Sequence, residues 1–373
     1  MNKPIEKLTQ LGQSLWYDNI ERRLLKDGSF ESMIAAGDIR GVTSNPSIFQ
    51  KAIADSEDYN EDLRALAAQG IAAEPIFESM AVDDIRTATD LFRPVYEESD
   101  GGDGFVSIEV SPLLADDTEA TTTEARRLWE WVDRPNLMVK IPATQAGLPA
   151  IERSIAAGIN INITLIFSQT RYLQVMDAYL AGLEQRVAAG LPVDGIASVA
   201  SFFVSRIDSK VDARLEALVE AEGEHAGTAK ALMGRIAIAN ARLAYQKFKA
   251  VFEGQRFAAL KASGARVQRP LWASTSTKNP AYRDVRYVET LIGPDTVNTV
   301  PPATLEAFKD HGHAEATLET GLEEAAEDFV RLEMLGIDFA EVTAELEAEG
   351  VKAFADSYLS LLDTVEKRRL EAL

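Results

Sequence analysis

Short apolar runs alternate with longer amphipathic segments along most of this chain. The short runs are rich in β-branched and aromatic residues, which favour strands, and the longer ones carry apolar residues at spacings of three and four, which favour helices. The clearest predicted helices are ATTTEARRLWEWVD and SQTRYLQVMDAYLAGLEQRVAAG, and Gly70, Gly158 and Gly190 are predicted helix ends. The predicted strands cover residues 15–19, 40–45, 105–111, 137–142, 161–167, 197–204, 270–275 and 296–301.

Eight strands that alternate with helices predict an α/β protein of the (β/α)₈ class, the TIM barrel. An open, doubly wound sheet is the rival architecture. Such sheets often carry a glycine-rich phosphate motif between a strand and a helix, and this motif is missing from the sequence. The glycines at 101–104 precede a predicted strand and therefore indicate only a loop.

Two segments exceed a minimal barrel. Residues 205–268 have room for two or three helices where one would do, and residues 313–373 are rich in Glu and Ala with a helical period. We expect the C-terminal helices to pack on the outside of the barrel or across one of its mouths. No Pro-, Ser- or Gly-rich linker separates them, so the sequence predicts a single domain over residues 1–373.

The amino-acid composition of the chain limits the kinds of molecule that the protein is expected to bind. The chain of 373 residues has 38 basic and 59 acidic side chains, a formal net charge of −21, which disfavours nucleic acid and anionic membranes as partners. An anionic small substrate would need local cations around it. Cysteine is absent, which excludes disulfides and thiolate chemistry. With no signal peptide and no apolar run of transmembrane length, we expect a cytoplasmic protein.

Polar residues gather where the predicted strands end, which in a barrel is the edge that carries active sites. Each has an ordinary explanation alone: Asp18 could cap a helix, and Asn45-Pro46 could form a turn. Together they would be costly to bury unless they bind a polar molecule. They are Asp18, Thr43, Ser44, Asn45, Glu109, Ser111, Lys140, Asn160, Asn162, Thr164, Ser201, Arg206, Ser274, Thr275, Ser276 and Lys278.

Lys140 stands out because it lies inside the apolar run LMVKIPAT. A lysine amine near a buried strand end must be paired or uncharged, and an uncharged amine attacks carbonyl groups. The alternative is a strand-end lysine that reaches solvent.

The surrounding residues fit one chemistry, in which the amine forms an imine with a ketone and so permits cleavage of a neighbouring carbon–carbon bond. Asp18 and Glu109 could move the protons. The amides and hydroxyls of Asn45, Asn162, Ser201 and Thr164 could hold a polyol, and Arg206 and Lys278 could hold a phosphate.

A metal centre is not predicted. The three histidines are His225, His311 and His313, and the last two lie at a charged helix end, where we interpret them as solvated residues. We therefore expect no metal.

Six motifs in order resemble transaldolase, in its larger bacterial form, over residues 15 to about 310. They are GVTSNPSIFQKAI at 41–53, VSIEVSP at 106–112, MVKIPAT at 138–144, INITLIFS at 161–168, SFFVSRID at 201–208 and LWASTSTKNP at 271–280.

The resemblance implies a cofactor-free Schiff-base enzyme of the pentose phosphate pathway. It would move a dihydroxyacetone unit from sedoheptulose 7-phosphate or fructose 6-phosphate to glyceraldehyde 3-phosphate or erythrose 4-phosphate. Carried over by motif, Lys140 forms the imine, Asp18 handles the proton of the donor hydroxyl, and Glu109 with Thr164 holds a water. The implied substrate contacts are Asn45, Asn162 and Ser201 for hydroxyls and Arg206 for phosphate, with Thr43 and Phe203 beside them.

The sequence departs from the family pattern after the seventh predicted strand. Many transaldolases have a second phosphate-binding arginine there, whereas this chain has Ser276, with Lys278 two residues on. We assign Ser274 and Lys278 to this part of the site, although lysine lacks the planar fork of arginine.

Two other functions remain open at this stage. A related aldolase, which releases free dihydroxyacetone, resembles a site with glutamine in place of Glu109 and tyrosine in place of Phe203, and this chain has neither. A non-catalytic sugar-phosphate sensor is the other alternative. Sugar phosphates are the expected partners, and both a homodimer and a monomer are compatible with the sequence.

Overall fold

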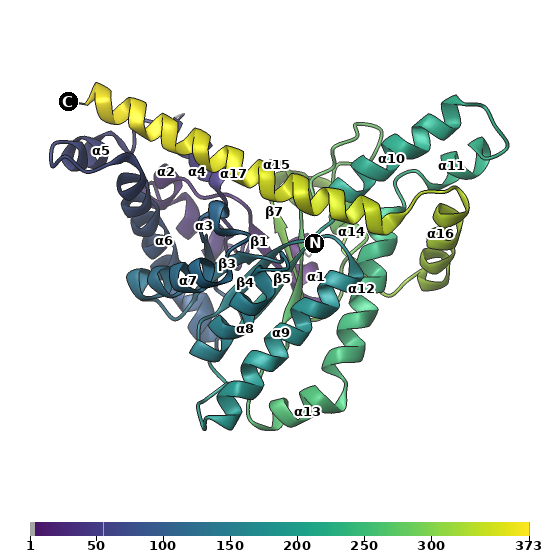
Figure 1. The fold of residues 1–373 in the computed structure, drawn as a ribbon, viewed down its shortest axis with the longest axis horizontal. Helices are drawn as coiled ribbons and strands as arrows, with labels where there is room; N and C mark the ends of the chain where they lie inside the picture. Colours follow the sequence, from purple (N-terminus) through teal and green to yellow (C-terminus); the bar gives the residue numbers. More distant parts are fainter. Residues whose placement is uncertain (1–3, 55, 373) are drawn as a thin grey trace.

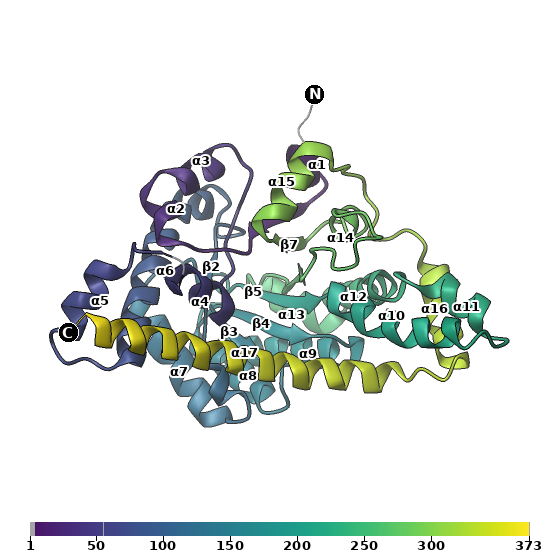
Figure 2. The same ribbon diagram turned by 90° about the horizontal axis from the view of Figure 1, so that it is seen from above.

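The protein is an α/β structure built on a parallel sheet. The computed structural model describes residues 4–54 and 56–372; residues 1–3, 55 and 373, part of the predicted domain, lie outside it. Within those ranges the sheet has seven strands in the order β1-β7-β6-β5-β4-β3-β2, all pairs parallel. Helices surround the strands in both views (Figures 1 and 2).

The strands are nearly continuous runs of buried residues, as expected for a parallel sheet covered on both faces. Only Glu109 at the end of β2 and Arg269 at the start of β6 are partly exposed. The predicted strands 137–142 and 296–301 match within one residue, and the others within two, apart from 40–45. The strands are β1 (Gln13–Tyr17), β2 (Val106–Glu109), β3 (Leu137–Pro142), β4 (Ile161–Ile166), β5 (Ser198–Phe203), β6 (Arg269–Ala273) and β7 (Thr296–Val300).

The predicted strand at 40–45 is reduced to one bridging residue. Val42 pairs in parallel with Tyr17 of β1 and with Val106 of β2, the two edge strands of the sheet. Backbone hydrogen bonds continue on both sides: Tyr17 N donates to Gly41 O and Val42 N to Phe105 O, each at 2.9 Å. We call residues 40–43 the seam. The prediction of eight strands is thus confirmed for seven. The predicted strand at 40–45 is cut short because the chain turns into α4, which begins at Pro46.

Local signals explain where several helices begin and end. Asp117 accepts a hydrogen bond from Ala120 N at the start of α7, and Ser168 accepts one from Arg171 N at the start of α9. Gly158 ends α8 with a positive φ, as predicted. The helices before β6 outside the insertion are α1 (Pro4–Gln10), α2 (Arg22–Lys26), α3 (Ser29–Ala35), α4 (Pro46–Ala54), α5 (Asn60–Ala67), α6 (Ala73–Glu98), the 3₁₀ turn η1 (Pro112–Leu114), α7 (Thr118–Val132), α8 (Gly147–Ala157) and α9 (Gln169–Ala188).

The insertion between β5 and β6 holds four helices, so the prediction of two or three was wrong. Gly234, with a φ of +70°, separates two of them. The buried Asp208 carboxylate accepts hydrogen bonds from Ala237 N and Tyr287 Oη and so ties the insertion together. The helices are α10 (Ser205–Glu220), α11 (Ala226–Leu232), α12 (Ile236–Phe252) and α13 (Gln255–Ala262), followed later by α14 (Arg286–Glu289) and α15 (Pro302–His311).

Two helices, α16 (Leu322–Met334) and α17 (Phe339–Glu371), form the C-terminal extension. Helix α17 runs across the molecule from beside α16 to beside α5 (Figures 1 and 2). In the first half of α17, Glu347 forms an ion pair with Arg171 of α9. Near the C-terminal end of α17, Arg368 donates a hydrogen bond to Ser56 O. Gly350 lies against Leu165 of β4, where an added Cβ would come within 2.9 Å of Leu165 Cδ2. A glycine here therefore lets α17 approach the strands closely.

None of the helices in residues 4–54 and 56–372 is both long and apolar enough to cross a membrane.

Candidate active site

Three predicted site residues lie side by side at one level of the sheet. In the strand register, Glu109 of β2 is the partner of Lys140 on β3, and Lys140 is the partner of Asn162 on β4. The Lys140 side chain is only 6% exposed, so it does not reach solvent at the strand end. Its Nζ donates to Ser44 O at 3.2 Å and lies 3.5 Å from Glu109 Oε2. The amine is therefore buried beside a carboxylate and a carbonyl.

Glu109 is suited to exchanging protons near neutral pH. Burial raises the pKa of its carboxyl to about 7, the charge of Lys140 opposes this shift, and Asp18 adds to it. Glu109 Oε2 is buried and accepts no hydrogen bond from the residues described. The carboxyl can thus gain or lose a proton at small cost, and one of its oxygens is available to another molecule.

Asp18 follows β1 directly, at the same end of the sheet. Its Oδ1 accepts a hydrogen bond from Thr43 Oγ1 at 2.6 Å, and Thr43 Oγ1 is also 2.6 Å from Thr299 Oγ1 on β7. Burial raises the pKa of the Asp18 carboxyl, whereas Lys140, the Thr43 hydrogen bond and Lys278 lower it. The seam therefore supplies the hydroxyl that orients this carboxylate.

A cavity of about 250 Å³ opens above Lys140, and we call it the central cavity. Of the residues to which the sequence analysis assigned a role in the site, all but Glu109 and Asn162 line it. The predicted residues around it are Asp18, Thr43, Asn45, Lys140, Thr164, Ser201, Phe203, Arg206, Ser274 and Lys278.

Asn162 is not part of the lining of the central cavity, and its side chain forms hydrogen bonds with two neighbours. Its Nδ2 donates to Ser107 Oγ at 3.0 Å, and its Oδ1 accepts from Ser201 Oγ at 2.7 Å. In this arrangement Asn162 holds Ser201 in place, and its own contact with a substrate stays a prediction. Thr164, two residues further along β4, does line the cavity, and its buried Oγ1 has no hydrogen-bond partner within the described ranges.

Asn45 has two structural roles. Its Oδ1 accepts a hydrogen bond from Ile48 N at 3.0 Å and so caps α4, which begins at Pro46. The same side chain lines the central cavity. The cap fixes the side chain, and its amide nitrogen is left to bind other groups.

Two cations face the central cavity together. Arg206, in the first turn of α10, lies with its guanidinium carbon 5.2 Å from the centre of the Phe203 ring, and it forms no ion pair with any residue described. Lys278 Nζ donates to Ser276 Oγ at 2.7 Å. Burial lowers the pKa of both groups, and the charge of Arg206 lowers that of Lys278 further. Two neighbouring positive charges beside one cavity favour the binding of an anion there.

Both cations also line a larger outer cavity of about 770 Å³, which shares Asp18, Asn45 and Phe354 with the central one.

Ser274 shapes the loop that carries Lys278. It has a φ of +54°, its Oγ is 3.0 Å from Ser205 Oγ, and its carbonyl accepts from Ser205 N. The end of β6 is thereby fixed to the start of α10.

Three contributors to the site were not assigned from the sequence. Phe354 of α17 lines the central cavity, and its ring centre is 5.7 Å from Lys140 Nζ. Thr299 of β7 holds Thr43, and Ser44 contributes its main-chain carbonyl to Lys140. Thr299 lies in a predicted strand end and could have been found by its position. Phe354 comes from a helix whose docking no local pattern reveals.

Within the described part of the chain, no group of three or more His, Asp or Glu side chains could hold a metal ion. His311 instead pairs with Asp284 and Asp310 at the surface.

Comparison of the sequence with known proteins shows to which family the chain belongs. A family model described as transaldolase/fructose-6-phosphate aldolase matches residues 15–365. The chain belongs to this family. The match extends through α10–α13 and nearly all of α17, so the insertion and the C-terminal extension fall within the region that the family model covers.

Individual members are similar along almost their whole length. A protein named transaldolase from Parafrankia sp. (strain EAN1pec) is 49% identical over 369 residues, which cover 99% of this chain and 98% of the relative. Transaldolase 1 of Streptomyces coelicolor is 50% identical over 97% of this chain and 94% of its own. A transaldolase of Thermobifida fusca is 49% identical over 99% of both.

Proposed function

We propose that this member of the family is a transaldolase of the non-oxidative pentose phosphate pathway. It transfers a dihydroxyacetone unit from sedoheptulose 7-phosphate or fructose 6-phosphate to glyceraldehyde 3-phosphate or erythrose 4-phosphate. The observation that carries the proposal is the Lys140 amine, buried at the floor of a polar cavity between the carboxyls of Asp18 and Glu109. The names of the similar proteins support the same reaction.

The reaction begins when the Lys140 amine attacks the ketone carbon of the donor. The resulting carbinolamine loses water, and the protonated imine withdraws electrons from the neighbouring carbon–carbon bond. Asp18 takes the proton of the hydroxyl next to that bond, the bond breaks, and the shortened aldose leaves. The three-carbon enamine on Lys140 then attacks the aldehyde of the acceptor. Hydrolysis of the new imine returns the ketose product and the free lysine.

Glu109 and Thr164 serve the water steps of this scheme. Both present a buried oxygen without a hydrogen-bond partner in the described structure, and a water held between them would satisfy both. With a pKa of about 7, Glu109 can donate a proton to the departing hydroxyl of the carbinolamine and accept one when water attacks the imine.

The remaining residues hold the substrate. Ser201 and Asn45 line the central cavity and bind hydroxyls of the donor, with Asn162 orienting Ser201. Arg206 binds the phosphate, with Lys278 as the second charge in place of the arginine that many relatives use. Thr43 orients Asp18, and Ser274 fixes the loop before Lys278.

Two rivals are less well supported. An aldolase that releases free dihydroxyacetone is expected to have another hydroxyl near the catalytic water, and Phe203 offers none. A sensor without catalysis has no use for a lysine buried between two carboxyls, which is costly to maintain.

The arrangement also supports three structural proposals. The seam joins both edges of the sheet, so we infer a closed (β/α)₈ barrel in which residues 40–43 act as the eighth strand. The contacts of α17 with α4 and α6 favour a single domain over residues 1–373. Location in the cytoplasm remains our expectation for an enzyme of this pathway.

The test is to trap the imine. The protein is incubated with fructose 6-phosphate, reduced with borohydride and mapped by peptide mass spectrometry, with and without erythrose 4-phosphate; Lys140→Arg serves as the control. A three-carbon adduct on Lys140 that diminishes with acceptor supports transfer. An adduct that is indifferent to acceptor favours the aldolase, and no adduct on Lys140 overturns the proposal.

A further inference from the structure

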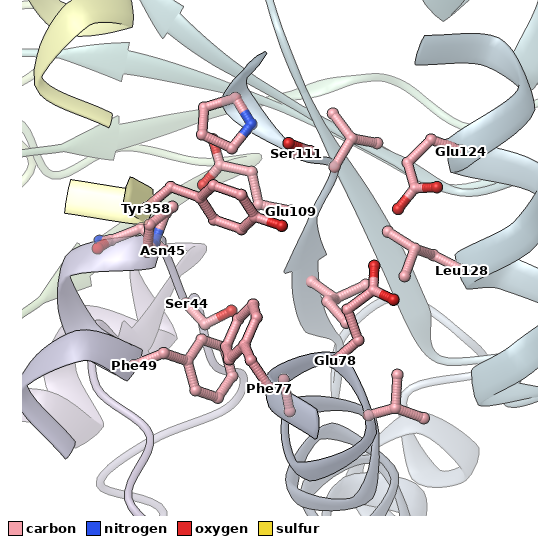
Figure 3. A pocket seen from close by; sticks show the side chains of 16 residues that line it. Ser44, Asn45, Phe49, Phe77, Glu78, Glu109, Ser111, Glu124, Leu128 and Tyr358 are labelled. Carbon is pink, nitrogen blue, oxygen red and sulfur yellow. The ribbon is translucent and has the colours of Figure 1, made fainter. Parts of the chain in front are cut away.

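A second, smaller cavity lies behind Glu109, and we call it the side pocket. It is enclosed by β2, η1, α4, α6, α7 and α17, and its volume is about 40 Å³. Figure 3 shows Phe49 and Phe77 at the lower left, Glu124 and Leu128 at the right, and Tyr358 with Glu109 above the two phenylalanines. Most of the other lining residues are apolar, such as Ala81, Val82, Ile108 and Val110.

The pair formed by Glu109 and Lys140 separates the two cavities. Glu109 lines the side pocket and not the central cavity, whereas Lys140 lines the central cavity and not the side pocket. Glu109 Oε2 lies 3.5 Å from Lys140 Nζ and accepts no hydrogen bond from the described residues, while the Glu109 side chain lines the side pocket. The Glu109 carboxyl is therefore next to the side pocket, whereas the Lys140 amine is next to the central cavity.

The size of the side pocket decides what it can hold. A water needs at least about 10–15 Å³ of such volume, so about 40 Å³ admits a few waters and excludes a sugar or a drug-sized molecule. A buried water also needs two to four polar partners. Glu109, Ser111 and the amide nitrogen of Asn45 provide them, and the Tyr358 hydroxyl, which donates to Glu74 Oε1 at 2.7 Å, can still accept a hydrogen bond.

The far end of the side pocket reaches the surface. The side chains of Glu78 and Glu124 line it there and are 22% and 16% exposed, whereas that of Glu109 is 4% exposed. Both glutamates pair with Arg127, so the side pocket leads from a partly exposed ion-paired rim to the buried Glu109 carboxyl.

The central cavity is poorly placed to supply water during turnover. Phe354 lines it close to Lys140, and a bound sugar phosphate would occupy the rest. Yet imine formation releases one water, and imine hydrolysis consumes one at the same carbon.

We propose that the side pocket is a water-binding site that exchanges water and protons between Glu109 and solvent while the substrate fills the central cavity. The inference rests on the proposed Schiff-base chemistry for its assignment of Glu109. It adds a second route to the site, one that does not pass through the opening used by the sugar.

The variant Ala81→Leu tests the route, because Ala81 is a buried wall of the side pocket on α6 and three added carbons would fill the space. The matched control is Ala88→Leu, two turns further along the same helix, buried, and lining neither cavity. Thermal unfolding shows whether each variant is folded, and Ala81→Val provides a milder filling if Ala81→Leu is not.

The readout is the loss of ¹⁸O from the ketone of labelled fructose 6-phosphate, followed by mass spectrometry and corrected for the rate without enzyme. Each cycle of imine formation and hydrolysis exchanges this oxygen with water. We expect Ala81→Leu to slow the exchange about tenfold, with Ala88→Leu near wild type and the borohydride adduct on Lys140 still formed. Adding Phe354→Ala to Ala81→Leu should restore exchange by admitting water from the other side.

The outcomes separate the two proposals. Exchange at the wild-type rate in folded Ala81→Leu overturns the water route and leaves the Schiff-base chemistry intact. Slow exchange that Phe354→Ala fails to restore, or that Ala88→Leu shares, also overturns the route, because distortion then explains it. An absent adduct on Lys140 in the wild-type protein overturns the proposed function itself.

Discussion

Phe354 and Tyr358 lie one helical turn apart on α17 and close two different cavities. Phe354 lines the central cavity near Lys140, and Tyr358 lines the side pocket near Glu109. Residues at i and i+4 point in the same direction from a helix, so one face of α17 covers both sides of the lysine–glutamate pair. A single helix therefore controls how water reaches the proposed imine.

Removing the Phe354 ring should weaken the preference for transfer. In Phe354→Ala, water gains access to the imine on Lys140, so we expect release of free dihydroxyacetone without acceptor to rise relative to transfer. Both rates are measured on the same preparation. Phe339→Ala removes another α17 aromatic, packed on Phe329 at a ring distance of 4.8 Å, and should leave the ratio unchanged. An unchanged ratio in Phe354→Ala would show that the ring does not shield the imine.

Arg206 should govern affinity for the phosphate. Loss of a charge-assisted hydrogen bond costs roughly 1.5–3 kcal/mol, so Arg206→Gln is expected to raise the KM for fructose 6-phosphate by about 10- to 100-fold. Lys278→Gln should have a smaller effect, since Lys278 is more exposed than Arg206 and its charge is therefore better screened. The control substrate is unphosphorylated fructose, whose turnover should not change in either variant. An equal loss with both substrates would assign Arg206 to another role.

The raised pKa of Glu109 makes a prediction about stability and pH. A carboxyl with a folded pKa of about 7, against an ordinary value of 4.5, favours the folded state fully below pH 4.5 and loses this contribution as pH rises to 7. The unfolding free energy of wild type minus that of Glu109→Gln should therefore fall over this window, by on the order of 3 kcal/mol. Denaturant titrations at pH 5 and pH 8 measure it. A difference that rises with pH would contradict the predicted direction.

The hydrogen bond from Thr43 stabilises the ionised form of Asp18 and so lowers its pKa. In Thr43→Val the pKa of Asp18 should rise, and the acidic limb of the pH profile of kcat should move to higher pH. Thr299→Val is the matched control, because it removes the other neighbour of Thr43 and leaves the bond to Asp18 intact. A limb that moves equally in both variants would point to a general disturbance of this end of the sheet.

The sequence predicted the strands well because buried parallel strands have a strong local signature. Residues 137–142 match β3 in full, and Lys140 could be placed at a strand end on that basis alone. The segment 40–45 was harder. Its apolar content is small, and Asn45 and Pro46 favour a helix start, so its pairing depends on neighbours distant in the sequence.

The parts of the site that escaped prediction depend on long-range packing. The contact of Asn162 with a substrate stays a prediction; its hydrogen bonds with Ser107 and Ser201 could not be foreseen, because strand periodicity does not show which neighbours a buried amide meets. Phe354 is contributed by α17, which approaches β4 through the contact of Gly350 with Leu165. The helical spacing of apolar residues predicts that α17 forms, but it does not predict which part of the protein the helix packs against.

The hydrogen bond that holds Lys140 ends on the main-chain carbonyl of Ser44, which the seam positions between the edges of the sheet. A carbonyl belongs to every amino acid, so a scan that replaces each side chain in turn cannot delete this acceptor. Position 44 could thus tolerate several residues in such a scan while the contact persists. Exchanging the amide that follows it for an ester would weaken the carbonyl as an acceptor, and that chemical change would reveal a dependence that genetics overlooks.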